Sequence, residues 1–221
     1  MLVDCLKLTS LECCCGRNLS SLNIYNNVLK RINFPIIWEE DLRAFAPCAT
    51  FPELEIMRLE IYSMIRTSPK ITQPLKYLKQ LDILIYFPWF HLNEEEYEEF
   101  DLMLILNILQ ASPFLQKLSV MVIPRLFENQ KDIRDVEIFS HDKVKVIEFG
   151  GCVGNWYEIE FVMNVLKYAK KLEKIVVSPY WREDDSSDMN SNPVWFQSGR
   201  DKISEKIQGE EIVGREKLVL L

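Results

Sequence analysis

The stretch that most constrains the fold spans residues 144–177, VKVIEFGGCVGNWYEIEFVMNVLKYAKKLEKIVV, in which strand, turn and helix signals follow one another without interruption. β-Branched and aromatic residues fill VKVIEF, and the glycine-rich GGCVG ends this predicted strand. Asn155 and Glu158 have the spacing of a capping box, which satisfies the free N–H groups at a helix N-terminus. The stretch therefore predicts two strands joined by a helical crossover.

The predicted helix has one apolar and one polar face. Its apolar residues recur at steps of three and four, as on a buried helix face. Glu160, Asn164, Lys167 and Lys170 occupy the opposite face. We therefore expect these four side chains to lie in solvent.

The two predicted strands share one spacing of apolar residues, at positions one, four and six. It occurs in Val144, Ile147 and Phe149 and again in Leu172, Ile175 and Val177. A strand with the pattern L-x-x-L-x-L, followed by a crossover, is typical of a leucine-rich repeat. We therefore predict an α/β fold, a leucine-rich-repeat solenoid with a parallel β-sheet on its concave face and helices and loops on its convex face.

Further sets with this spacing precede the stretch. They are Leu8, Leu11 and Cys13; Leu19, Leu22 and Ile24; Leu29, Ile32 and Phe34; Ile56, Leu59 and Ile61; Leu78, Leu81 and Ile83; and Leu115, Leu118 and Val120. The first three sets start about ten residues apart, which predicts narrow rungs with tight returns, whereas later rungs widen to about twenty residues. Helices are predicted over residues 38–46, over residues 93–110 and around Ile203 and Ile207, with a last strand over residues 217–221.

Composition excludes several classes of function. A net charge of -7 repels a phosphate backbone, so no nucleic-acid partner is expected. The longest apolar run is too short for a bilayer and the first residues lack a signal peptide, so we expect no membrane association and a cytoplasmic or nuclear location. Cys13, Cys14 and Cys15 are adjacent and the two histidines stand alone, which favours reduced cysteines and no metal site or cofactor.

No residue pattern marks an enzyme. The chain shows no nucleophile with a base and no Gly-rich phosphate loop, so we predict no catalytic residues. The segment GGCVG offers one alternative, a nucleophilic Cys152, although a repeat places this cysteine at a structural bend. A small-molecule receptor on the concave face is a further alternative.

The order of elements resembles that of a plant family. Residues 144–177 with the helix-and-strand tail 201–221 resemble the FBD domain of plant F-box proteins, and PFLQKLSVMV after LQASP resembles the repeats that precede it. The resemblance implies leucine-rich repeats over residues 1–135 and FBD-like repeats with a cap over residues 136–221, continuous in one solenoid.

It also implies the substrate-recognition arm of an SCF-type ubiquitin ligase. In that family an N-terminal F-box binds a Skp-type adaptor, whereas here residue 1 falls directly before a repeat. The expectation is therefore a fragment, a truncated product or a relative without the ligase link, for which adaptor binding does not follow.

The leading hypothesis is a non-catalytic protein-interaction module, because a parallel sheet exposes the residues between its core leucines on one surface. The alternative for each such residue is a solvated position without a partner, and the partner itself is unknown. The candidate partner-binding residues are Ser21, Asn23, Tyr25, Arg58, Glu60, Tyr62, Lys117, Ser119, Met121, Glu148, Lys174 and Val176.

Overall fold

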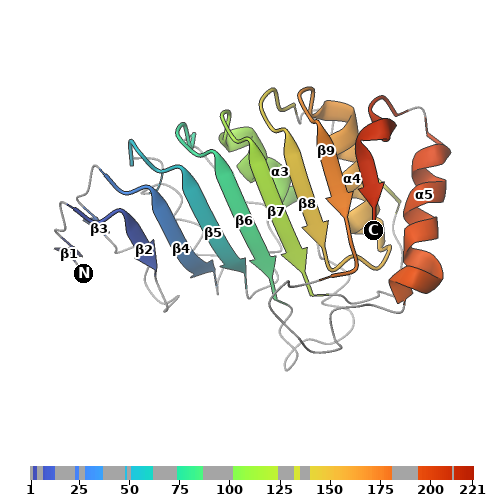
Figure 1. Ribbon diagram of the computed structural model, residues 1–221, viewed down its shortest axis with the longest axis horizontal. Helices are drawn as coiled ribbons and strands as arrows, with labels where there is room; N and C mark the ends of the chain where they lie inside the picture. Colours follow the sequence, from blue (N-terminus) through green and yellow to red (C-terminus); the bar gives the residue numbers. More distant parts are fainter. Residues whose placement is uncertain are drawn as a thin grey trace.

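The computed structural model contains an all-parallel sheet of eight strands in the order β10-β9-β8-β7-β6-β5-β4-β2 (Figure 1). The strands are β2 (Ser10–Glu12), β4 (Arg31–Ile36), β5 (Ile56–Ile61), β6 (Gln80–Ile85), β7 (Lys117–Val122), β8 (Val146–Gly150), β9 (Lys174–Val177) and β10 (Leu218–Leu220). The structure describes residues 2–3, 7–12, 23–24, 28–36, 48, 51–61, 74–86, 102–123, 132–134, 140–180, 194–210 and 212–221. Because spatial order follows chain order, each rung adds one strand to its predecessor, which confirms the predicted solenoid.

Helices cover one face of the sheet. Helices α3 (Met103–Ala111) and α4 (Trp156–Tyr168) lie behind the strands in Figure 1. A π-helix, η4 (Trp195–Gly199), runs into α5 (Arg200–Gln208) at the C-terminal end of the sheet, and a 3-10 helix, η5 (Arg215–Lys217), leads into β10. The core lies between the sheet and these helices.

Register explains why the repeated leucines form one core. Neighbouring strands pair with the same offset, so the fourth residues of successive repeats lie side by side. This row consists of Met57, Leu81, Leu118, Ile147 and Ile175, all fully buried. The predicted set of Ile56, Leu59 and Ile61 is wrong by two residues, because Met57 rather than Leu59 pairs with Leu81. A strand that alternates buried and partly exposed residues thus presents one face to the core and one to solvent.

The stretch 144–177 folds as predicted, with β8, α4 and β9 in order and a capping box at Asn155. The expectation of a solvent-facing polar side on the helix is wrong for Glu160 and Asn164, which are only 3% and 1% exposed. Residues 132–134 cover them. The guanidinium group of Arg134 donates to both carboxylate oxygens of Glu160, and the backbone carbonyl of Arg134 accepts a hydrogen bond from Asn164 Nδ2 at 3.0 Å. Lys170 is exposed and Lys167 is half-buried.

The prediction of narrow N-terminal rungs is also wrong. Strand β2 pairs directly with β4, and β3 (Asn23–Ile24) pairs with β1 (Leu2–Val3) in a separate two-stranded sheet. Two ten-residue steps therefore make one rung. The physical reason is that consecutive parallel strands need a crossover of about a dozen residues or more, which a ten-residue repeat cannot hold.

The remaining predicted elements fall partly within the described residues. Helix α3 forms the second half of the helix predicted over residues 93–110, and residues 38–46 lie outside the described part. The C-terminal helix and strand are confirmed: Ile203 and Ile207 of α5 are buried, and β10 pairs in parallel with β9. Within the described residues no helix is both long and apolar enough to span a bilayer.

Candidate functional site: the open face of the sheet

The sheet face opposite α3 and α4, here called the open face, presents one continuous row of side chains. Strand pairing aligns one residue from each of the eight strands, so the row crosses the whole sheet. It consists of Glu12, Asn33, Arg58, Asp82, Ser119, Glu148, Val176 and Val219. The regular offset of the repeat, rather than any local motif, brings these residues together.

Two shorter rows flank this central row. Toward the strand starts lie Arg31, Ile56, Gln80, Lys117, Val146 and Lys174. Toward the strand ends lie Pro35, Glu60, Leu84, Met121 and Gly150. The three rows together place acidic and basic residues from β2 to β9, whereas the central row ends in valines on β9 and β10.

Ion pairs and hydrogen bonds connect the polar side chains of the open face. Lys117 Nζ lies 3.0 Å from Glu148 Oε2 on the neighbouring strand, and both side chains are about 40% exposed. Arg58 Nη2 lies 3.6 Å from Glu60 Oε1 on the same strand. Pairs exposed to this degree contribute little to stability, typically below about 1 kcal/mol. Their charges therefore remain accessible to a partner.

Asp82 is the most deeply placed carboxylate of the central row. Burial raises its pKa, which the hydrogen bond from Gln80 Nε2 at 3.0 Å and the charges of Lys117 and Arg58 oppose. The carboxylate thus lies between two basic residues on neighbouring strands. A partner that covers it would have to preserve these contacts or replace them.

Beside Asp82, two polar atoms lack a hydrogen-bond partner within the described part of the chain. They are Asn33 Oδ1, an acceptor, and Arg58 Nε, a donor, and both atoms are buried. The two residues are direct neighbours across β4 and β5. An unmade hydrogen bond at a buried polar atom costs about 1–3 kcal/mol.

The structure places eight of the twelve predicted partner-binding residues on the open face. They are Arg58, Glu60, Lys117, Ser119, Met121, Glu148, Lys174 and Val176. Asn23 lies in β3, which belongs to the two-stranded sheet instead. Ser21, Tyr25 and Tyr62 lie outside the described residues. Binding by this set stays a prediction.

Sequence reasoning missed several open-face residues, including Asn33, Gln80, Asp82 and Leu84. The sequence contains the signal, because Leu81 and Ile83 are predicted core positions and the residues that alternate with them must face the other way. Asn33 was missed because the predicted ten-residue repeats did not show which strands pair with β4.

The alternative role of Cys152 as a nucleophile finds no support in its surroundings. The thiol is fully buried and lies 3.6 Å from the carbonyl oxygen of Phe149. Burial, with the nearby Glu158 carboxylate, raises its pKa well above the usual range, whereas an activated cysteine has a lowered one. Its backbone N–H donates to Ser178, as expected of a bend. No metal-binding group of three or more His, Cys, Asp or Glu occurs among the residues described.

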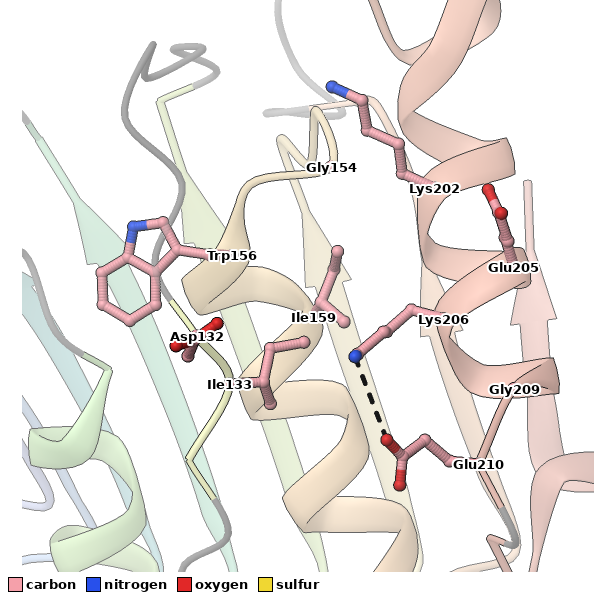
Figure 2. Close-up of a pocket in the computed structure, with 10 residues that line it drawn as sticks. All are labelled: Asp132, Ile133, Gly154, Trp156, Ile159, Lys202, Glu205, Lys206, Gly209 and Glu210. Carbon is pink, nitrogen blue, oxygen red and sulfur yellow. Dashed lines mark ion pairs between the residues drawn. The ribbon is translucent and has the colours of Figure 1, made fainter.

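A groove of about 540 Å³ lies on the helical side, between α4, α5 and residues 132–134 (Figure 2). Its lining includes the apolar side chains of Ile133, Trp156 and Ile159. Along α5 its rim carries charges of both signs, including an ion pair of 3.9 Å between Lys206 and Glu210. The groove can accept an apolar side chain, but its described lining contains no nucleophile beside a base.

Comparison with known proteins identifies one family. The family model described as At1g61320/AtMIF1, LRR domain, matches residues 40–215, about four-fifths of the chain. No curated protein and no solved structure matches the chain. The match covers strands β5 to β9 and helices α3, α4, η4 and α5, and therefore includes most of the open face.

Proposed function

The chain belongs to the leucine-rich-repeat family of At1g61320/AtMIF1, and we propose that it binds a protein partner on its open face without catalysing a reaction. A leucine-rich-repeat domain implies protein interaction, because stacked repeats present a large, continuous surface. The family match supports this class of function. The choice of face rests on the geometry of the sheet.

The row of charged side chains, in which the exposed Lys117 and Glu148 form an ion pair across neighbouring strands, is the observation that favours the open face. This surface carries charge of both signs, because the basic Arg58 and Lys117 lie beside the acidic Asp82 and Glu148 on neighbouring strands. Such a surface suits a polar protein partner that supplies both a donor and an acceptor. The valines at the β9 and β10 end add an apolar margin to the same surface.

We further propose that the partner is a substrate of an SCF-type ubiquitin ligase, with this chain as the recognition arm. The support is the resemblance of residues 144–177 and 201–221 to the FBD region of F-box proteins. The repeat family adds support for the recognition domain alone. A binding module that acts without the ligase is the competing possibility.

Co-purification of tagged protein from plant cells tests both proposals. The central variant is Arg58→Glu/Lys117→Glu, which reverses two charges of the open face. The matched control is Lys202→Glu/Lys206→Glu, which makes the same charge change on exposed positions of α5. Circular dichroism and thermal melting establish that both variants are folded.

We expect the open-face variant to lose proteins that wild type and control retain. Equal recovery by both variants would contradict the choice of face. Recovery of a Skp-type adaptor and a cullin with the wild type would support the ligase role. Their absence, with other partners retained, would favour the free-standing module.

A further inference from the structure

The turns that lead into the strands form a second surface, separate from the open face, along the upper edge of the sheet in Figure 1. A continuous ladder of backbone hydrogen bonds holds these turns in register. Its links are Glu55 N to Lys30 O at 2.9 Å, Lys79 N to Glu55 O at 2.8 Å, Gln116 N to Lys79 O at 2.8 Å, Lys145 N to Gln116 O at 2.9 Å and Glu173 N to Lys145 O at 2.8 Å. Residues at equal distances before these positions therefore lie next to one another.

The residue two positions before each ladder residue lies on the turn. In four successive repeats these residues are Tyr77, Phe114, Lys143 and Lys171, which we call the edge strip. Neighbouring strands are about 4.8 Å apart, so the strip is about 15 Å long. Two aromatic side chains occupy one half of it and two lysines the other half.

The two aromatic residues of the edge strip are unusually exposed. Tyr77 is 50% and Phe114 is 54% accessible to solvent. The residue after each of them, Leu78 or Leu115, fills the core position of its rung and is buried. The core therefore does not require an aromatic residue at either place, and adjacent exposed aromatics are typical of interaction surfaces.

Charge distinguishes this edge from the rest of an acidic protein. The four acidic residues on these turns, Glu53, Glu55, Asp142 and Glu173, each pair with a lysine, namely Lys30, Lys79, Lys170 and Lys145. Lys76, Lys143 and Lys171 have no ion pair within the described part of the chain. Among the described residues of these turns, three positive charges therefore remain uncompensated, although the whole chain has a net charge of -7.

We propose that the edge strip docks an acidic segment of a partner protein in which apolar side chains occupy one half and carboxylates the other half. An extended segment crossing the turns would place its apolar side chains on Tyr77 and Phe114 and its carboxylates on Lys143 and Lys171. Charge complementarity selects the acidic partner, and the aromatic half selects a segment with apolar groups. This surface differs from the open face, so either proposal can fail without the other.

Fluorescence anisotropy with a labelled peptide of about eight residues tests the proposal, since such a peptide spans about 26 Å when extended and can cross the strip. The probe carries Leu or Phe in one half and Glu or Asp in the other half. One comparison peptide replaces the acidic residues with Lys, and another replaces the apolar residues with Ser. We expect only the first peptide to bind, with weaker binding at higher salt because the charges are exposed.

Variants of the strip localise the binding. We expect Tyr77→Ser/Phe114→Ser and Lys143→Glu/Lys171→Glu each to weaken binding of the acidic peptide at least tenfold. The matched controls, Phe196→Ser and Lys202→Glu/Lys206→Glu, change exposed residues of the same kinds elsewhere and should leave binding unchanged. Thermal melting checks that every variant is folded.

Three results would overturn the proposal. The first is no binding of the acidic peptide to wild type, or equal binding of the Lys-containing peptide. The second is unchanged binding by both strip variants. The third is self-association of the protein, seen by sedimentation and lost in the strip variants, which would assign the strip to contacts between copies of the chain.

Discussion

Gly154 and Gly199 pack backbone against backbone: a Cβ atom added at Gly154 would lie 2.7 Å from the Cα atom of Gly199. Gly154 has a φ of 88° and lies in the loop before α4, whereas Gly199 ends η4. The contact holds the C-terminal helices against the repeat that precedes them. The indole N–H of Trp195, in the same π-helix, donates to the carbonyl oxygen of Leu221 at 2.7 Å and adds the last strand to this junction.

Gly199→Ala should therefore destabilise the protein. The new methyl group would lie 2.4 Å from the carbonyl oxygen of Val153, so the backbone must shift. Overpacking of this kind costs about 1–3 kcal/mol. Urea unfolding measures the loss. The matched control is Gly209→Ala at the end of α5, where the nearest atom is 3.5 Å away, and it should be neutral or slightly stabilising. Equal stability of the two variants would contradict the close packing.

Glu158 should make stability depend on pH. Its Oε2 accepts hydrogen bonds from the backbone N–H groups of Val153, Gly154 and Asn155, yet burial raises its pKa from 4.5 to about 7. Because the folded pKa is the higher one, this group stabilises the fold below pH 4.5, and that contribution is lost as the pH rises through 7.

The comparison that isolates this effect is wild type against Glu158→Gln, which keeps an acceptor oxygen but cannot titrate. Between pH 4.5 and 7 the free energy of unfolding of wild type should fall relative to the variant, by up to about 3 kcal/mol. Urea unfolding across this range measures the difference. Parallel pH profiles would show that the carboxylate keeps an ordinary pKa.

His141 should titrate below the usual histidine range. Its Nδ1 accepts from the backbone N–H groups of Lys143 and Val144 at 3.2 and 3.0 Å, so Nε2 carries the proton and donates to Ser112 O at 2.9 Å. Burial is the main cause that lowers its pKa below 6.5. The stability contributed by this neutral ring is present above pH 6.5 and is lost as the pH falls through the folded pKa.

Proton NMR of the His91→Gln variant, in which His141 is the remaining histidine, measures this pKa directly. We expect a midpoint below 6.5 in the folded protein and an ordinary midpoint in urea. Identical midpoints in the two states would contradict the buried, neutral ring.

Leu172→Asp tests the placement of the last repeat before the C-terminal cap. Leu172 is 3% exposed, so an aspartate there would place a carboxylate among apolar side chains and should cost about 3 kcal/mol or more. The control Glu173→Asp puts the same side chain one residue further along, at an exposed position, and should melt like wild type. If both variants melt alike, the core face of this rung is misassigned.

Local patterns predicted the parts of the fold that depend on neighbours in the chain. The capping box at Asn155 and the strand–helix–strand order of residues 144–177 both follow from spacings of a few residues. The C-terminal strand was also predicted, because a short apolar end is readily added to an open sheet edge.

Patterns failed where distant residues meet. Glu160 and Asn164 look solvated from the helix period alone, but Arg134, which lies 26 residues before Glu160, covers them. The same holds for the candidate site. The alternation of buried and exposed residues along a strand predicts that Arg58 and Lys117 lie on the open face, but their neighbours on adjacent strands depend on the register between repeats.

The sequence by itself determined the repeat and its core, because the one-four-six spacing gives each strand one apolar face wherever the strand lies. Only the tertiary structure decided that β2 pairs with β4, that Asn33 and Arg58 lie side by side, and that Tyr77 and Phe114 share an edge with Lys143. Each of these depends on the length of a crossover and the register it imposes. Those quantities come from long-range packing, which no local period specifies.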